Sequence, residues 1–330
     1  MPAQGERLPR GGAHRDRPGF RAVPSLRYLD DTPRFARHAY AENGSEREDI
    51  GPAGGFMRDG RAETLRTQAL LPLLDPAEMA NADIATLAAR LRSISRDGDF
   101  ETVCGPQVFA TVAATADCAA GALQQFELED ASFHPYSSRY DAFLAGTATL
   151  SASELNGLRL FADPAKGNCS ACHPHQPRPG GRGPVFTDFS FHALGVPRNA
   201  ALAANRDPQF FDLGLCGPKR SDLAAERQYC GFFKTPTLRN VARRRAFFHN
   251  GRYQTLEAAV RFYLDRDRGP LADGATERYD DLPPALRANI DRSAAPFNRR
   301  PSEAPALSES ELRDLLAFLR TLDDADQARD

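Results

Sequence analysis

Apolar residues recur at helical spacing along the first half of the chain, but only beyond its opening segment. Residues 1 to about 55 are rich in Gly, Pro, Arg and Asp, which predicts an extended loop, disordered up to Pro18. From Glu63 the pattern becomes helical, and Pro76 begins a new segment. The residues expected near one face of this helix are Leu65, Ala69, Leu70 and Leu73.

Two more helices are predicted before residue 140. Asp83 can cap a helix over Ile84 to Ile94, because its carboxylate can accept a backbone N–H of the first turn. Val108 to Ala120 is the other candidate helix. The buried stripe expected on the helix that Asp83 caps consists of Ile84, Leu87, Leu91 and Ile94.

A second unit is expected to open near Tyr140 and to contain three helices. Ser151 with Glu154, and Ser308 with Glu311, have the spacing of capping boxes that begin its first and last helices. Thr255 to Asp265 is the third helix, and the region from Pro174 to Pro236 is loop-rich. The apolar stripe of the last helix is Leu312, Leu315, Leu316, Leu319 and Leu322.

The sequence therefore predicts an all-α, loop-rich protein of two domains, residues 1–140 and 141–330. A net charge of −2 gives no reason to expect a nucleic-acid partner. No apolar run approaches the length of a membrane span, and no secretory apolar region follows Met1.

Cys169-Ser170-Ala171-Cys172-His173 carries the most specific chemistry in the chain. Two thiols separated by two residues can add to the two vinyl groups of one porphyrin, and the adjacent imidazole can then bind the iron. A redox Cys-x-x-Cys does not need the histidine, and a structural zinc site would need a second ligand pair at similar spacing. The motif predicts covalent haem c, with Cys169, Cys172 and His173 as its binding residues.

A second axial ligand for this iron has to come from a residue other than methionine. The three methionines are Met1, Met57 and Met79, and all lie outside the second unit. A tyrosinate would stabilise ferric iron and lower its reduction potential. The candidates for this position are His175, His192, His249, Tyr253 and Tyr263.

Several segments together resemble the bacterial di-haem cytochrome c peroxidase and MauG superfamily. They run in family order from about Pro24 to the C-terminus. The matching segments are Asp59-Gly60-Arg61-Ala62, Gln68, Pro76-Ala77-Glu78-Met79, Cys169 to His173, Phe186-Thr187-Asp188, Thr235-Pro236-Thr237-Leu238-Arg239-Asn240-Val241 and His249-Asn250-Gly251-Arg252-Tyr253-Gln254-Thr255-Leu256-Glu257.

The resemblance implies two fused cytochrome c domains, one with an electron-transfer haem and one with a peroxidatic haem. Cys169 to His173 matches the electron-transfer haem, and the position of its distal ligand falls on Tyr263, as in MauG-type proteins. His249 matches a histidine near the haem edge, where it could instead bond a propionate. Gln68 and Glu78 match the polar pair beside the peroxidatic haem, where a carboxylate can move protons during O–O cleavage.

The sequence also departs from the family pattern. A second Cys-x-x-Cys-His is expected upstream of Pro24 and is missing, which together with the missing signal peptide predicts an N-terminal truncation or a misplaced start. Arg58 stands where the family has a tryptophan that relays electrons. Calcium is not expected, because the family's ligand positions hold Ala22, Arg244 and Ala246 in this chain.

The four other cysteines can form Cys104–Cys118 and Cys216–Cys230, although four free thiols are the alternative. An enzyme of this family would be periplasmic and would reduce hydrogen peroxide with electrons from a small cytochrome c or cupredoxin. The alternatives are a MauG-like haem oxidase acting on a protein or small-molecule partner, and a mono-haem electron-transfer protein without peroxidase activity. A homodimer is also among the expected assemblies.

Overall fold

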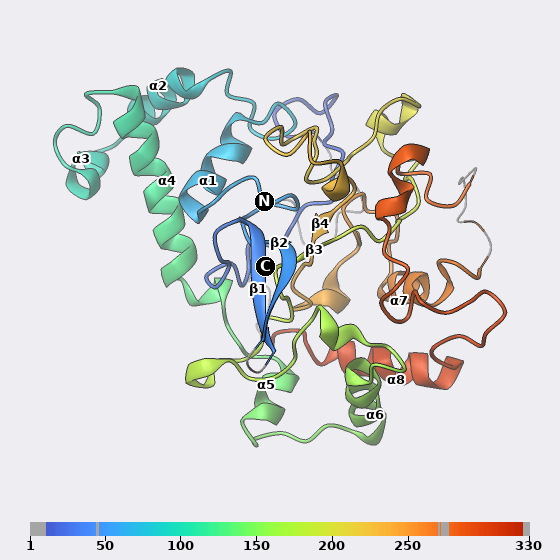
Figure 1. Cartoon of the computed structure of the whole chain (residues 1–330). Coiled ribbons are helices and arrows are strands. Elements are labelled where there is room, and N and C mark those ends of the chain that lie inside the picture. Colours follow the sequence, from blue (N-terminus) through green and yellow to red (C-terminus); the bar gives the residue numbers. More distant parts are fainter. Residues whose placement is uncertain (1–10, 44–45, 270, 272–276, 326–330) are drawn as a thin grey trace.

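The computed structural model describes residues 11–43, 46–269, 271 and 277–325. Its helices gather in two groups, with α1 to α4 on one side of the molecule and α5, α6 and α8 on another (Figure 1). Within the described ranges, none of the helices is long and apolar enough to span a bilayer. The helices are α1 (Leu65–Leu74), α2 (Ile84–Ile94), α3 (Asp99–Cys104), α4 (Val112–Glu129), α5 (Arg139–Leu144), α6 (Ala152–Ala162), α7 (Leu256–Asp265) and α8 (Glu309–Arg320).

The predicted helix-rich, loop-rich fold is confirmed, but the described residues are not entirely helical, because they also contain two small antiparallel sheets. Strands β1 (Ala36–Asn43) and β2 (Glu46–Ala53) form a hairpin inside the segment predicted to be a loop. Strands β3 (Phe191–His192) and β4 (Phe233–Lys234) pair within the loop-rich region. The predicted disorder up to Pro18 was also wrong for residues 12 and 13, whose backbone N–H groups donate to the carbonyls of Ala77 and Glu78. Residues 1–10 lie outside the described ranges.

Helices α1, α2 and α4 pack against one another in the first half. Asp83 caps α2 as predicted, accepting the backbone N–H of Thr86 at 2.7 Å. The predicted stripe of α2 was partly wrong, because Ile84 and Ile94 are exposed whereas Leu87 and Ala88 are buried. Helix α4 begins later than predicted, because Thr111 is its cap.

The second half has its core between α6 and α8, and both predicted capping boxes are present. Helix α8 buries its predicted apolar stripe in this core. Gly157 on α6 allows the two helices to meet, since a Cβ there would lie 2.0 Å from the carbonyl oxygen of Asp314. Any larger residue at position 157 would therefore force the helices apart.

The two predicted disulfides are present in the structure. Cys104 on α3 is bonded to Cys118 on α4, and Cys216 is bonded to Cys230 in the loop-rich region. Each pair is separated by 14 residues. Among the described residues, the cysteines that remain free are Cys169 and Cys172, the two that haem attachment requires.

A buried ion cluster joins the hairpin region to the loop-rich region. Arg21 places Nη1 2.6 Å from Asp59 and binds Asp212 through two hydrogen bonds of 2.6 and 2.7 Å. Asp59 is fully buried and also accepts from Arg61 at 2.8 Å. Burial opposes ionisation of Asp59, but the two guanidinium groups outweigh it and hold its pKa below the usual range.

This lowered pKa predicts acid sensitivity. Because the folded pKa of Asp59 is below the unfolded one, its contribution to stability is present above the unfolded pKa of about 3.9 and is lost as the pH falls through the folded pKa. Asp59→Asn should lower the free energy of unfolding by about 3–5 kcal/mol at neutral pH and flatten its loss in acid. Urea unfolding across pH measures both, and the exposed Asp16→Asn is the control. An unchanged acid profile would contradict the assignment.

Candidate haem site

The Cys169 to His173 segment leaves the end of α6 and forms one tight turn, Cys169–Ala171. Asn168 has a left-handed backbone, with φ of 50°, which reverses the chain ahead of Cys169. The backbone N–H of His173 donates to the carbonyl of Cys169 at 2.9 Å. Burial raises the pKa of each free thiol, Cys169 and Cys172, to about 12, so both are protonated at neutral pH.

His173 is oriented by one hydrogen bond. Its Nδ1 lies 2.7 Å from the carbonyl oxygen of Phe186. A carbonyl can only accept, so Nδ1 carries the proton and Nε2 keeps its lone pair. Burial also lowers the pKa of His173, which favours the neutral imidazole that an iron ligand requires. The geometry therefore presents Nε2 as a metal donor.

Hydrogen bonds connect the haem-attachment motif with the later segments that resemble the family, and connect those segments with one another. The backbone N–H of Asp188 donates to the carbonyl of Cys172 at 3.0 Å, and Thr187 Oγ1 donates to the carbonyl of Thr235 at 2.7 Å. Thr237 Oγ1 donates to the carbonyl of Val185 at 2.6 Å. These bonds explain why segments far apart in sequence meet at one site.

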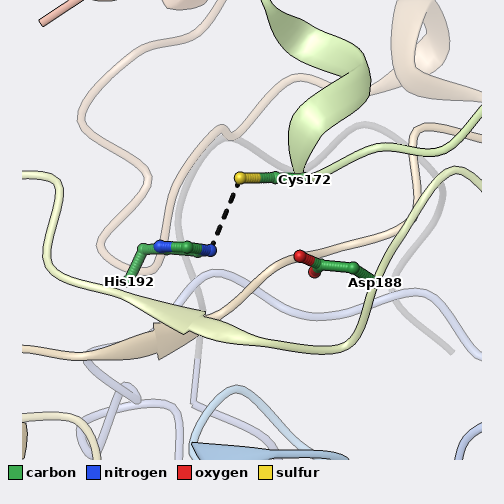
Figure 2. Close-up of side chains that lie close together, drawn as sticks. All are labelled: Cys172, Asp188 and His192. Atoms are coloured by element: carbon green, nitrogen blue, oxygen red, sulfur yellow. Dashed lines mark hydrogen bonds between the residues drawn. The ribbon is translucent and has the colours of Figure 1, made fainter. Parts of the chain in front are cut away.

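A polar chain that the sequence did not reveal lies beside Cys172. Its sulfur is 3.4 Å from His192 Nε2, and the side chains point toward each other (Figure 2). Ser190 Oγ lies 2.8 Å from the same nitrogen and 2.6 Å from Asp188. Cys172, Asp188 and His192 could together approach a metal ion. Thioether formation with haem would engage the Cys172 sulfur instead.

One cavity of about 320 Å³ extends from the thiols to the first half of the chain. Its wall includes Cys169, Cys172 and His173, with apolar side chains of α7 and α8 around them. The wall also includes Met57 and Gln68 from the first half of the chain. Two thiols, an imidazole with a free Nε2 and an apolar wall are what a covalently attached haem requires, so the residues present fit this group.

The five candidates for the second axial position differ in whether they line the cavity. Its wall includes His192, His249 and Tyr263 but neither His175 nor Tyr253. His249 is engaged elsewhere, because its Nε2 lies 3.0 Å from Asp281 and its ring stacks on Phe233 at 3.7 Å.

Tyr263 lies on α7 and stacks on Phe297, with 5.4 Å between ring centroids. In the described part of the chain its hydroxyl has no hydrogen-bond partner. Burial, followed by the nearby Cys169 and Cys172, raises the pKa of Tyr263. Tyr263 is therefore the candidate that faces the cavity and is not already engaged by another polar group.

The two residues predicted for peroxide chemistry are placed differently. Gln68 is 5% exposed on α1 and lines the cavity, and its Oε1 is buried without a hydrogen-bond partner. Glu78 lies on the turn after α1 and outside the described wall of the cavity. Partial burial, followed by Asp75, raises the pKa of Glu78. The orphaned oxygen of Gln68 marks a place where a ligand could donate a hydrogen bond.

A family model for di-haem cytochrome c peroxidase matches residues 4–149. The methylamine utilization protein MauG of Paracoccus denitrificans is 32% identical over 321 residues, covering 93% of this chain and 75% of that protein. The chain belongs to the di-haem cytochrome c peroxidase and MauG family. It spans 64% of a second MauG, from Methylophilus methylotrophus, at 29% identity.

The fold of this family member has a solved counterpart. The diheme peroxidase BthA of Burkholderia thailandensis superposes with a TM-score of 0.84 at 38% identity, covering 98% of this chain and 77% of that one. The cytochrome c551 peroxidase of Nitrosomonas europaea is 31% identical over 216 residues, covering 63% of this chain and 55% of that protein. Relatives of the chain thus carry both MauG and peroxidase names.

Proposed function

We propose that the chain is a periplasmic c-type haem oxidoreductase that reduces hydrogen peroxide with electrons from a small donor protein, a cytochrome c or a cupredoxin. The observation that carries this proposal is the His173 ring, held by Phe186 with Nε2 free, next to two unpaired thiols. The match to a diheme peroxidase over 98% of the chain supports it. A haem bound here supplies the electron storage that the reaction needs.

The roles of the chain's own residues follow from their positions. Cys169 and Cys172 would hold the haem, and His173 would bind the iron with the tautomer that Phe186 enforces. Gln68 would bind a ligand in the cavity through its free Oε1. Glu78 would move the protons that peroxide cleavage requires, which needs its turn to approach the substrate.

Peroxide consumption by the haem-loaded protein with a reduced cytochrome c tests the proposal. Glu78→Gln should lower turnover by about 10²–10⁴-fold and leave the haem spectrum unchanged. Glu63→Gln is the matched control, because Glu63 is an exposed acid paired with Arg34 ahead of α1. Equal activity of both variants would remove Glu78 from the mechanism, and a haem-loaded protein without peroxide turnover would favour an electron-transfer role.

The second candidate function is a MauG-like oxidase acting on a protein or small-molecule partner, which the placement of Tyr263 in the cavity supports. A tyrosinate on the iron would stabilise the ferric state. Tyr263→Phe should then raise the reduction potential and change the ferric absorption and EPR spectra. Tyr253→Phe is the control, because Tyr253 also packs on Phe248 but lies outside the cavity wall. Identical spectra for both variants would exclude Tyr263 as a ligand.

A further inference from the structure

Three basic side chains line the cavity and pair with no carboxylate of the described residues: Arg58, Lys234 and Arg244. Each is anchored by a backbone carbonyl instead. Arg58 Nε donates to Ala22 at 2.7 Å, and Arg244 Nη2 donates to Val23 at 2.7 Å. Lys234 Nζ donates to Gly55. The anchors fix the three cations and leave their remaining donors in the cavity.

The acids nearby are already engaged by other groups. Asp212 and Asp59 bind Arg21, and Asp59 also binds Arg61. Asp281 in the cavity wall accepts from Asn250 at 2.8 Å and lies beside His249. The wall's Asp291 accepts the backbone N–H groups of the turn that follows it. Among the residues that the structure describes, none of these acids therefore pairs with Arg58, Lys234 or Arg244.

Buried charge without a counter-ion is costly, and it disfavours the charged form. Burial lowers the pKa of Lys234 to about 7 and that of Arg58 to about 9, and the neighbouring Arg244 contributes to the latter shift. A negatively charged group inside the cavity would reverse both effects. Guanidinium and ammonium groups bind carboxylates through charge-assisted hydrogen bonds.

The same cavity holds the thiols and the imidazole that fit a haem, and a haem carries two propionate carboxylates. We propose that Arg58, Lys234 and Arg244 form a carboxylate-binding site in the cavity wall, and that haem propionates fill it. The assignment rests on the haem attachment proposed above. It explains why cations from two distant segments, Arg58 in one and Lys234 and Arg244 in the other, share a cavity where no acid of the described ranges pairs with them.

Fixed positive charge beside a haem favours the reduced state, because reduction adds an electron. Removing one of the cations should therefore lower the midpoint potential of the haem. Lys234→Met keeps the length of the side chain and removes its charge. Lys219→Met is the matched control, because Lys219 is already neutralised by Asp75 at 2.5 Å and lies outside the cavity wall.

The test uses the haem-loaded protein and two readouts that do not depend on turnover: spectroelectrochemical titration and the propionate bending modes of the resonance Raman spectrum. Lys234→Met should lower the potential and shift the propionate modes, Lys219→Met should change neither, and Lys234→Arg should restore both. A potential and propionate modes in Lys234→Met equal to those of the parent would overturn the assignment, even if peroxide turnover persisted.

Calorimetric titration with succinate separates the two sources of a carboxylate. If propionates fill the site, succinate should not bind the haem-loaded protein. Succinate binding that disappears in Lys234→Met would show that the site is open to solutes and would overturn the propionate assignment. Intact mass is measured first, because it separates failure of the proposed function from failure of this inference. A chain without covalent haem refutes the proposed function. A haem-loaded chain in which Lys234→Met leaves the midpoint potential unchanged refutes this inference alone.

Discussion

Replacing both Cys169 and Cys172 by serine should give a chain that carries no covalently bound haem. The two thiols are unpaired and share one cavity with His173, so they are the groups positioned to form thioether bonds. Serine removes the sulfur and keeps a similar volume. Intact mass after denaturation, together with haem staining of a denaturing gel, should show complete loss of the cofactor mass. Each single variant should retain one thioether bond.

The disulfide cysteines provide the control. Cys104→Ser with Cys118→Ser also removes two sulfurs, but these bridge α3 to α4. This variant should keep its covalent haem and lose about 3 kcal/mol of stability, the value expected for a loop of about 15 residues. Covalent haem in the Cys169/Cys172 double variant would contradict the attachment site.

Local signals explain the parts of the fold that the sequence predicts well. A capping box needs only four consecutive residues, and the boxes at Ser151 and Ser308 both begin the helices expected from them. Helix α2 has its predicted bounds for the same reason, because Asp83 fixes its start within one turn. Caps act through neighbouring backbone groups, so no tertiary contact is needed to read them.

The parts that were wrong lack a local sequence signal of this kind. The hairpin of β1 and β2 is held by pairing between its own strands and carries no alternation of apolar and polar residues. Ile84 and Ile94 fall at helical spacing with Leu87, yet α2 lies at the surface and turns only part of its apolar side inward. Spacing predicts which residues share a face, whereas burial depends on what packs against that face.

The candidate haem site also has one part that the sequence predicts and one part that it does not. Cys169, Cys172 and His173 are adjacent in the sequence, and their chemistry can be read from spacing alone. Arg58 and Lys234 are far apart in the sequence and belong to no motif for anion binding. Their shared position in one cavity becomes visible only when the two halves of the chain are assembled. The sequence alone therefore could not predict the proposed carboxylate-binding site.

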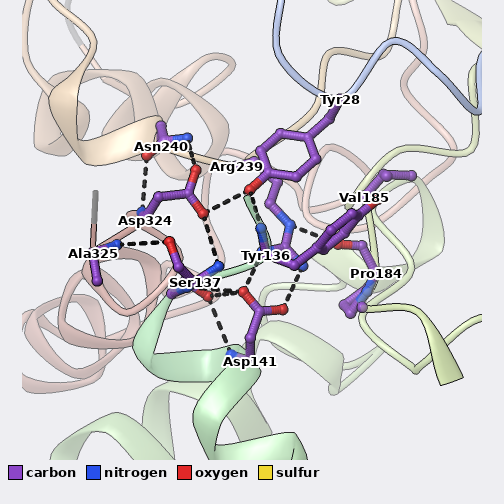
Figure 3. A network of polar contacts seen from close by, with 12 residues as sticks. Tyr28, Tyr136, Ser137, Asp141, Pro184, Val185, Arg239, Asn240, Asp324 and Ala325 are labelled. Atoms are coloured by element: carbon purple, nitrogen blue, oxygen red, sulfur yellow. Dashed lines mark hydrogen bonds and ion pairs between the residues drawn. The ribbon is translucent and has the colours of Figure 1, made fainter. Parts of the chain in front are cut away.

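A second polar network joins the start of the chain to its end (Figure 3). Arg239, fully buried in its side chain, binds Asp141 through two hydrogen bonds of 2.5 and 2.7 Å. Its Nε donates to the carbonyl of Pro184 at 2.8 Å, and its guanidinium lies 4.9 Å from the ring centroid of Tyr28. Tyr28 in turn donates to Asp324 at 2.6 Å. One guanidinium thus connects segments from three regions of the chain.

Arg239→Met should lower the free energy of unfolding by about 3–5 kcal/mol, because it leaves the Asp141 carboxylate partly buried without its partner. Arg261→Met is the matched control: Arg261 binds Glu309 with the same two-bond geometry, but on the surface, where water screens the pair. Urea unfolding of both variants at neutral pH measures the difference. We expect the midpoint to fall clearly for Arg239→Met and to stay unchanged for Arg261→Met. Equal effects would mean that burial does not set the strength of the Arg239 pair, and the network would then not hold the two ends of the chain together.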